Sequence, residues 1–177
     1  MNLTDYTTQF GDELRLCPKP PAELSEGDAS FLSAIGLPHS APGYLGFTID
    51  RGIESVVAQG WPTAIEGTHL YMIGHEGAGD PVVIDATTGQ LLVLDHEQGF
   101  VKRSFLNSTL PQLASTLAAV SRVMDSDYKF DDEATYIALL REIADIDFAA
   151  TLADGFWPSE LAMMLGDTIE PQWNKEG

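Results

Sequence analysis

Short apolar runs alternate with turn-forming residues through the middle of this chain. Between residues 44 and 106 the runs are separated by glycine, proline and aspartate, which is the pattern of β-strands rather than of helices. The strands predicted in this way cover residues 44–49, 53–57, 69–73, 82–85, 91–95 and 100–106. The middle of the chain is therefore expected to form a sheet.

Two of these strands are expected to form a hairpin. Residues 86–89 join them by a length typical of a hairpin turn, and Gly89 can adopt the positive φ angle that such a turn needs. Both runs are continuously apolar instead of alternating, which is typical of strands that are covered on both faces. We therefore predict that this antiparallel pair lies in the middle of the sheet, with helices on one of its faces.

Helices are predicted on both sides of the strand-rich part. Ser25 is the predicted N-cap of a short helix that buries one apolar face and stops at residues 36–38. The strongest periodic signal follows the last strand, where Asn107 or Ser108 can cap a helix with Pro111 in its first turn. The positions of this helix that should face the core are Leu110, Leu113, Leu117, Val120 and Met124.

Two more helices are predicted toward the C-terminus. The first begins near Asp131 and has an acidic outer face, and the second runs from Pro158 to Gly166. The residues expected to be buried are Ile137, Leu140 and Ile143 or Ala144 in the first helix, and Leu161, Met164 and Leu165 in the second. Trp157 and Trp173 are expected to pack beside the last helix.

One hydrophobic core fits the length of the chain. A protein of 177 residues buries roughly 70% of its unfolded surface, which supports a single domain over residues 1–177. Within it, prolines end an N-terminal arm, residues 1–24, whose Leu14 and Leu16 can dock on the core, and residues 125–177 form an acidic helical part. Strands that precede helices predict an α+β fold with a central, largely antiparallel twisted sheet of about five or six strands and helices packed around it.

The charge balance is strongly acidic. The formal net charge is −18, and 13 acidic residues against three basic ones lie in residues 125–177. Because phosphate backbones are bound by clusters of Lys and Arg, direct binding of nucleic acid is disfavoured. Two interpretations of the charge remain open: a solvated surface that confers solubility, and electrostatic steering of a basic partner.

The compartment follows from the cysteine count and from the N-terminus. Cys17 is the only cysteine, which excludes an intrachain disulfide and favours a reducing compartment. The first residues have neither the basic nor the apolar region of a signal peptide. The apolar stretch 81–95 is interrupted well short of the roughly 20 residues of a bilayer span. We expect a cytoplasmic protein that does not cross a membrane.

The glycine-rich segment 74–80 is the most enzyme-like feature. It fails the P-loop pattern because Asp80 and Pro81 follow its last glycine, and it fails the dinucleotide pattern because a strand follows instead of a helix. It is predicted to be a flexible hairpin connection. The alternative is a small-ligand enzyme or sensor in which His75 is the acid or base and Glu76 or Asp80 orients it.

The sequence offers no catalytic, metal or cofactor site. The four histidines, His39, His69, His75 and His96, lack metal-binding spacing. The Gly-x-Ser-x-Gly motif of a nucleophilic serine is not present, and Cys17 has no basic neighbour that would activate its thiol as a nucleophile. Asp125 begins a segment like a calcium-binding loop, but Lys129 and Phe130 occupy positions that need an oxygen ligand and glycine. We expect no cofactor.

Five short segments follow one another in an order that is more specific than any one of them. They are Phe31-Leu32-Ser33-Ala34-Ile35-Gly36-Leu37-Pro38, Tyr71-Met72-Ile73-Gly74, Pro81-Val82-Val83-Ile84-Asp85, Thr88-Gly89-Gln90-Leu91 and Phe105-Leu106-Asn107-Ser108-Thr109-Leu110. In this order and spacing the chain resembles the SUKH superfamily, and specifically its fourth immunity subfamily. The resemblance covers residues 28–124, with a weaker likeness at Trp157 and Pro158.

The resemblance implies a bacterial, cytosolic α+β protein that binds and neutralises a cognate polymorphic toxin. Such toxins are commonly nucleases or other enzymes that act on nucleic acids, and the family brings no catalytic residues. The implied mechanism is occlusion, in which an acidic surface covers the basic groove of the toxin. A scaffold for other protein partners stays open as a further alternative. Charge and loop position predict these partner-binding residues: Asp125, Asp127, Asp131, Asp132, Glu133, His75, Glu76 and Asp80.

Overall fold

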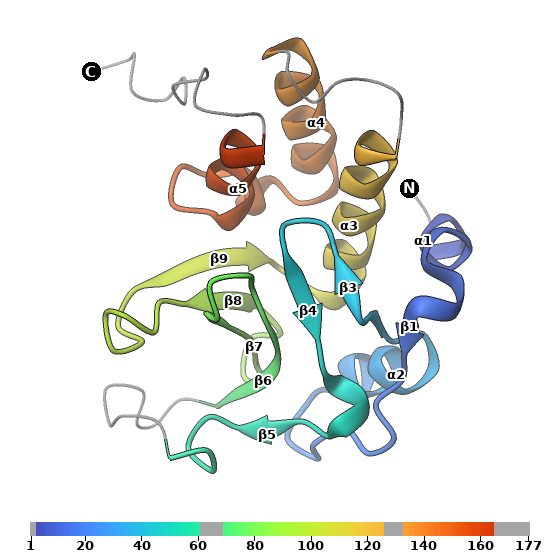
Figure 1. Cartoon of the computed structure of the whole chain (residues 1–177). Helices are drawn as coiled ribbons and strands as arrows, with labels where there is room; N and C mark the ends of the chain where they lie inside the picture. Colours follow the sequence, from blue (N-terminus) through green and yellow to red (C-terminus); the bar gives the residue numbers. More distant parts are fainter. Residues whose placement is uncertain (1–2, 61–68, 126–132, 165–177) are drawn as a thin grey trace.

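A curled antiparallel sheet forms the centre of the protein, and helices cover one side of it (Figure 1). The computed structural model describes residues 3–60, 69–125 and 133–164. The strand order is β3-β4-β6-β7-β8-β9, and β5 pairs with β6 beside this path, which gives seven strands. Their bounds are Ser40–Ala41 (β3), Leu45–Phe47 (β4), Glu54–Ser55 (β5), Leu70–His75 (β6), Pro81–Asp85 (β7), Leu91–Leu94 (β8) and Arg103–Asn107 (β9). The predicted α+β class is confirmed.

The β7–β8 hairpin lies in the interior of the sheet, as its apolar pattern predicts. Gly89 adopts a φ of 77° at the end of its turn. On one face, Val82, Ile84, Leu91 and Val93 join the main core together with apolar residues of the helices. On the other face, Val83 and Leu94 form a smaller cluster with Val56 and Leu70. The continuous apolar runs are thus explained, because both faces of the hairpin are buried.

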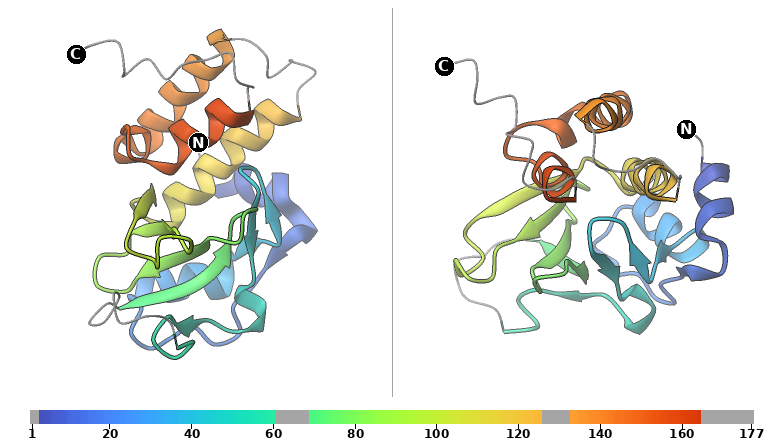
Figure 2. Two further views of the ribbon diagram at one scale, coloured as in Figure 1. Left: turned by 60° about the vertical axis from the view of Figure 1, so that its left-hand side comes forward. Right: turned by 45° about the horizontal axis from the view of Figure 1, so that its top comes forward.

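The described residues contain five α-helices, which all contribute to the main core on one face of the sheet. They are Leu3–Phe10 (α1), Glu26–Ala34 (α2), Leu110–Met124 (α3), Glu133–Ile146 (α4) and Phe156–Met164 (α5). The two views of Figure 2 show α3 between α1 on one side and α4 with α5 on the other. The predicted cap of α2 is confirmed, because the Ser25 hydroxyl accepts a hydrogen bond from the Asp28 amide at 3.1 Å.

The N-terminal residues pack closely against the rest of the fold. Tyr6 of α1 is fully buried, and its hydroxyl donates a 3.0 Å hydrogen bond to the carbonyl of Gly36. A two-stranded sheet, Leu14–Arg15 (β1) with Leu37–Pro38 (β2), ties the same segment to the end of α2. Leu14 packs against the core, whereas Leu16 is 48% exposed and does not dock on it. The structure therefore corrects the expectation for Leu16.

The cap of α3 also differs from the prediction. Thr109, not Asn107 or Ser108, is the N-cap, and its hydroxyl accepts a hydrogen bond from the Gln112 amide. Asn107 and Ser108 use their side chains in buried bonds to other elements, as described below, so neither is available to cap the helix. The apolar stripe is buried as expected except for Met124, which is 47% exposed because it is the last residue of the helix.

Smaller corrections concern α4, α5 and β9. In α4 the buried residues are Tyr136, Leu139 and Ile143, so Ile137 and Leu140 lie at the edge of the buried stripe instead of its centre. Helix α5 begins at Phe156, because a proline is tolerated in the first turn. Strand β9 begins at Arg103 because Phe100 adopts a φ of 65° in the preceding turn. Trp157 and Leu161 are buried as predicted, and Leu165, Gly166 and Trp173 lie outside the described residues.

Candidate functional site

The glycine-rich segment is a tight connection between β6 and β7. The amide of Glu76 donates to the Asp80 carbonyl at 2.8 Å, and the Gly79 amide donates to the Glu76 carbonyl at 2.9 Å. The carboxylate of Glu76 accepts hydrogen bonds from the amides of Ala78 and Asp80 at 2.7 and 3.0 Å. The predicted hairpin connection is confirmed, whereas its flexibility stays a prediction. One oxygen of Glu76 closes the connection.

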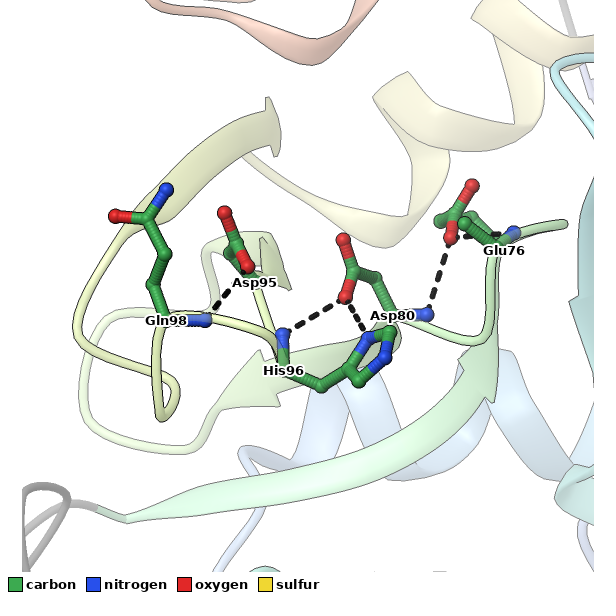
Figure 3. A network of polar contacts seen from close by, with 6 residues as sticks. Glu76, Asp80, Asp95, His96 and Gln98 are labelled. Carbon is green, nitrogen blue, oxygen red and sulfur yellow. Dashed lines mark hydrogen bonds and ion pairs between the residues drawn. The ribbon is translucent and has the colours of Figure 1, made fainter.

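Asp80 pairs with a histidine from another loop (Figure 3). Its Oδ1 accepts a 2.8 Å hydrogen bond from the His96 amide and lies 2.5 Å from Nδ1 of the same residue. The hydrogen bond to Asp80 is the main reason that the pKa of His96 is raised. Desolvation opposes this shift, and the negative charges of Asp80, Glu97 and Asp95 add to it. The β6–β7 and β8–β9 connections are held together in this way.

His75 takes no part in this pairing. Its imidazole lies against β4, so close that a Cβ on Gly46 would be 3.2 Å from its Cε1 atom. Within the described residues, Asp80 pairs with His96 and Glu76 with backbone amides. The orientation of His75 by Glu76 or Asp80, which the small-ligand enzyme or sensor requires, is thus not present in the structure.

Tyr44 stands beside this loop in an unusual conformation. It connects β3 to β4, its φ angle is +52°, and 73% of its surface is exposed. A left-handed conformation is uncommon for a non-glycine residue, and about 1 kcal/mol is a typical cost. Gly77 lies very close to Tyr44. If residue 77 had a Cβ atom, that atom would be only 2.9 Å from the Cβ of Tyr44. An aromatic side chain is therefore presented to solvent at an energetic cost.

Three neighbouring hollows in the surface have Tyr44 or Glu76 in their lining. The first, of about 440 Å³, lies between Tyr44 and the end of α3 and is lined by Glu13, Met124 and Asp125 among others. The second, of about 400 Å³, is lined by Tyr44, His75 and Glu76. The third, of about 160 Å³, lies between the β6–β7 loop and α5. Tyr44 lines the first two and Glu76 the last two, so the hollows are neighbours, and we call their combined lining the Tyr44 face.

The Tyr44 face is acidic and carries exposed apolar side chains. Within the described residues that line the three hollows there is no Lys or Arg, and the acidic ones are Glu13, Glu76, Asp80, Asp125 and Glu160. Besides Tyr44, the exposed apolar residues are Met124 and Met163, at 47% and 69% exposure. Aromatic residues and methionine are enriched in protein interfaces relative to other surface. The Tyr44 face thus combines acidic residues with exposed side chains of the types that protein interfaces favour.

Glu160 is the exceptional acid of this face. Only 4% of the residue is exposed, and its Oε1 atom has no hydrogen-bond partner in the described structure. Desolvation raises the pKa of Glu160, and the negative charge of Glu76 raises it further. A buried carboxylate without a partner is costly and needs an explanation.

A buried polar cluster fixes the position of α5 relative to the sheet. The indole Nε1 of Trp157 donates to the Asn107 Oδ1 at 3.1 Å, and the Nδ2 of Asn107 donates to Asp147 at 3.1 Å. Asp147 also accepts from the amide of Ser108 at 2.6 Å and from its hydroxyl at 2.9 Å. We call Asn107, Ser108, Asp147 and Trp157 the polar lock. It holds in place the helix that carries Glu160.

The predicted partner-binding residues are only partly gathered together. His75, Glu76, Asp80 and Asp125 line the hollows of the Tyr44 face, whereas Glu133 is the first residue of α4. Asp127, Asp131 and Asp132 lie outside the described residues. Tyr44 and Glu160 also line these hollows, and neither is among the predicted partner-binding residues. A signal for Glu160 existed, since it is the only charged residue in a strongly apolar helical segment.

The described residues contain no group of three or more His, Cys, Asp or Glu that could hold a metal ion. Among the described helices, none combines the length and the apolar character that a membrane crossing requires.

A match to a known protein family shows to which proteins this chain is related. The family model described as SUKH-4 immunity protein matches residues 19–163. The chain belongs to the SUKH-4 immunity protein family. Membership in SUKH-4 supports a toxin-immunity role and favours a non-enzymatic one. No curated protein and no solved structure matches the chain.

The match to SUKH-4 extends beyond the sequence resemblance at both ends. It includes residues 19–27, which lead into the first turn of α2, and it continues through α4 and most of α5 to residue 163. Both sides of the polar lock, Asn107 and Trp157, and also Tyr44 and Glu160 of the Tyr44 face, lie within the matched SUKH-4 region.

Proposed function

We propose that this protein neutralises a cognate bacterial toxin by covering the active site of the toxin with the Tyr44 face. Membership in the SUKH-4 family supports a toxin partner, and the acidic lining of the hollows supports a basic one. The observation that carries the proposal is Tyr44 itself, which is 73% exposed in a left-handed conformation between two acidic hollows. The fold keeps this exposed aromatic residue at a cost, which fits a residue used in binding.

The toxin best suited to this surface acts on nucleic acids. An enzyme that binds a phosphate backbone needs a groove rich in Lys and Arg. An acidic face complements such a groove, increases the rate of association and excludes the nucleic acid once it is bound. The net charge of −18 adds long-range attraction to this local complementarity. Both partners would meet in the cytoplasm, which fits the single buried cysteine, Cys17.

The chemistry is steric and electrostatic and needs no catalytic group. Tyr44 is already exposed in the free protein, and its Cβ lies close to Gly77, so it can act as an anchor that is accessible before binding. The methionines Met124 and Met163 lie in the flanking hollows and can adapt to the shape of the partner. An interface of standard size covers about 800 Å² of each partner, which is enough to include all three hollows.

Affinity purification from the host tests the proposed function. The tagged protein is recovered from the native organism at low and at high salt, and the co-purifying proteins are identified by mass spectrometry. We expect a basic toxin domain at low salt and much less of it at high salt, because screening weakens the attraction. Recovery of a tightly bound small molecule without a protein partner would contradict the proposal and support the small-ligand alternative. Recovery of a protein that is not toxic would support the scaffold alternative.

A further inference from the structure

We infer that the hollow beside Glu160 receives an arginine side chain of the partner. This inference rests on the proposed function and adds to it the chemistry of one contact. The hollow of about 160 Å³ is lined by residues from five places: the β6–β7 connection, β8, β9, the turn before α5 and α5 itself. Three of its lining residues are acidic, namely Glu76, Asp80 and Glu160. None of its described lining residues is Lys or Arg, so the chain itself supplies no counter-charge at this place.

Glu160 provides evidence of a missing ligand that an acidic cluster alone would not give. It is 96% buried and lines the hollow, and its Oε1 atom has no partner. Burial of an unpaired carboxylate is strongly unfavourable, and a cation that pairs with it on binding recovers that cost. The other two acids can contribute as well. Glu76 and Asp80 each use one oxygen in the bonds of Figure 3, and each carboxylate has a second oxygen that can accept from a cation.

The apolar part of the lining favours arginine over lysine. Phe156 and Met163 line the same hollow, and the ring of Phe156 is held by an edge-on contact with Trp157, with 5.2 Å between the ring centroids. A guanidinium group is planar, weakly hydrated and able to stack on an aromatic ring while it donates two parallel hydrogen bonds to a carboxylate. An ammonium group is more strongly hydrated and loses more on entering a partly apolar hollow.

The surroundings allow entry of such a side chain. Met163 is 69% exposed and flexible, so it can move aside at little cost. Phe156 and Glu160 sit on α5, which the polar lock holds against β9 through Trp157 and Asn107. The helix that carries the acceptor is therefore held in place before binding.

The test is a titration followed by NMR on the isotope-labelled full chain at low salt and pH 7.5. The probe is N-acetyl-arginine-N-methylamide. The controls are the lysine analogue, which has the same charge, and the citrulline analogue, which has nearly the same shape and no charge. We expect saturable shifts of the Ser104, Gly155 and Glu160 amides with the arginine probe. Binding of both controls should be weaker by at least about fivefold.

The protein variants are Glu160→Gln, which removes the charge at constant size, and Glu54→Gln, which removes an exposed charge on β5. Glu160→Gln should weaken binding of the arginine probe at least about fivefold, and Glu54→Gln should leave it unchanged. A dispersed spectrum confirms that each variant is folded, and Glu160→Ala serves as a second variant.

Three results would overturn the inference: no saturable shift with the arginine probe, equal binding of the lysine probe, or equal binding by the Glu160→Gln variant. These results are independent of the capture of a toxin from the host. If a toxin is recovered but the arginine probe does not bind, the inference is wrong and the proposed function stands. If the probe binds but no toxin is recovered, the hollow is an arginine site and the proposed function is wrong.

Discussion

Two carboxylates in the C-terminal part of the chain are equally buried and have opposite surroundings. Asp147 and Glu160 are each 4% exposed. Asp147 accepts three hydrogen bonds, one from Asn107 and two from Ser108. Glu160 has an oxygen with no partner in the described structure, and desolvation and, to a smaller extent, the nearby charge of Glu76 oppose its ionisation.

The difference separates a residue that builds the fold from one that is available to a partner. The bonds of Asp147 join the end of β9, the start of α3 and the turn after α4, so its burial stabilises the native state. The burial of Glu160 destabilises the free protein. Natural proteins keep such local costs mainly where binding or catalysis uses them. Burial alone therefore does not identify a structural residue, and the partners of its polar atoms must be counted.

The largest expected effect is the loss of the polar lock. Asp147→Ala leaves Asn107 and Ser108 without their charged acceptor in a buried place. We expect the free energy of unfolding to fall by about 3 kcal/mol, measured by urea denaturation. The matched control is Asp145→Ala, which removes an exposed acid of α4 and should change stability by less than about 0.5 kcal/mol. Equal effects of the two substitutions would show that the lock is not structural.

Glu160→Gln should increase the free energy of unfolding, whereas Asp147→Ala should decrease it. Because the folded-state pKa of Glu160 is raised, its contribution to stability is fully present below its unfolded pKa and is lost as the pH rises through the folded-state pKa. At about pH 8 the variant should be more stable than the wild type by about 1 kcal/mol, and the gain should shrink as the pH is lowered toward about 5. Denaturation at several pH values measures this. A variant that is less stable at pH 8 would contradict the assignment of Glu160 as an unpaired charge.

The cost of keeping Tyr44 in place lies in its backbone, whereas the cost of Glu160 lies in its side chain. The φ of +52° at Tyr44 is unfavourable for tyrosine and for alanine but not for glycine. Tyr44→Gly should therefore be more stable than Tyr44→Ala by about 0.5–1 kcal/mol in thermal or urea unfolding. If alanine is as stable as glycine at this position, the backbone is not strained there and the cost assigned to the exposed aromatic residue is wrong.

The smallest effect concerns the exposed pair Asp80 and His96. The raised pKa of His96 means that the pair contributes stability below the unfolded histidine pKa, about 6.5, and that this contribution is lost as the pH rises through the folded-state value. Asp80→Asn removes the main cause, so the pKa of His96 should fall toward its ordinary value. An NMR titration of the His96 ring measures it, and His69, which is also exposed, is the internal control. An unchanged pKa of His96 would show that Asp80 is not its partner.

Patterns of apolar residues predicted the elements well wherever burial is continuous. The β7–β8 hairpin has apolar residues on both of its buried faces, and α3 places apolar residues against the core on every turn. The strands β1, β2 and β3 have two residues each, which is too short for a periodic signal. The cap of α3 was predicted wrongly because Asn107 and Ser108 bond to Asp147, a residue far away in the sequence.

The candidate site was harder to predict than the fold. Charge and loop position pointed to Glu76, Asp80 and Asp125, which line the Tyr44 face. The two residues on which the proposals now rest are special only in three dimensions. Tyr44 lies against Gly77, which belongs to another loop, and the isolation of Glu160 depends on which side chains of the loop and of β9 surround it. The sequence holds no local signal for Tyr44, and its one signal for Glu160 is that this residue is the only charged one in an apolar helical segment.

The central claim is that the Tyr44 face binds the toxin, and one affinity measurement tests it directly. Isothermal titration calorimetry of the recovered toxin domain is compared for the wild type, Tyr44→Ala and Phe148→Ala. Phe148 is the matched control, because it is 70% exposed, aromatic and absent from the described lining of the three hollows. We predict that Tyr44→Ala weakens binding by at least about tenfold and that Phe148→Ala leaves it unchanged. Unchanged affinity of Tyr44→Ala, with or without a loss for Phe148→Ala, would contradict the claim.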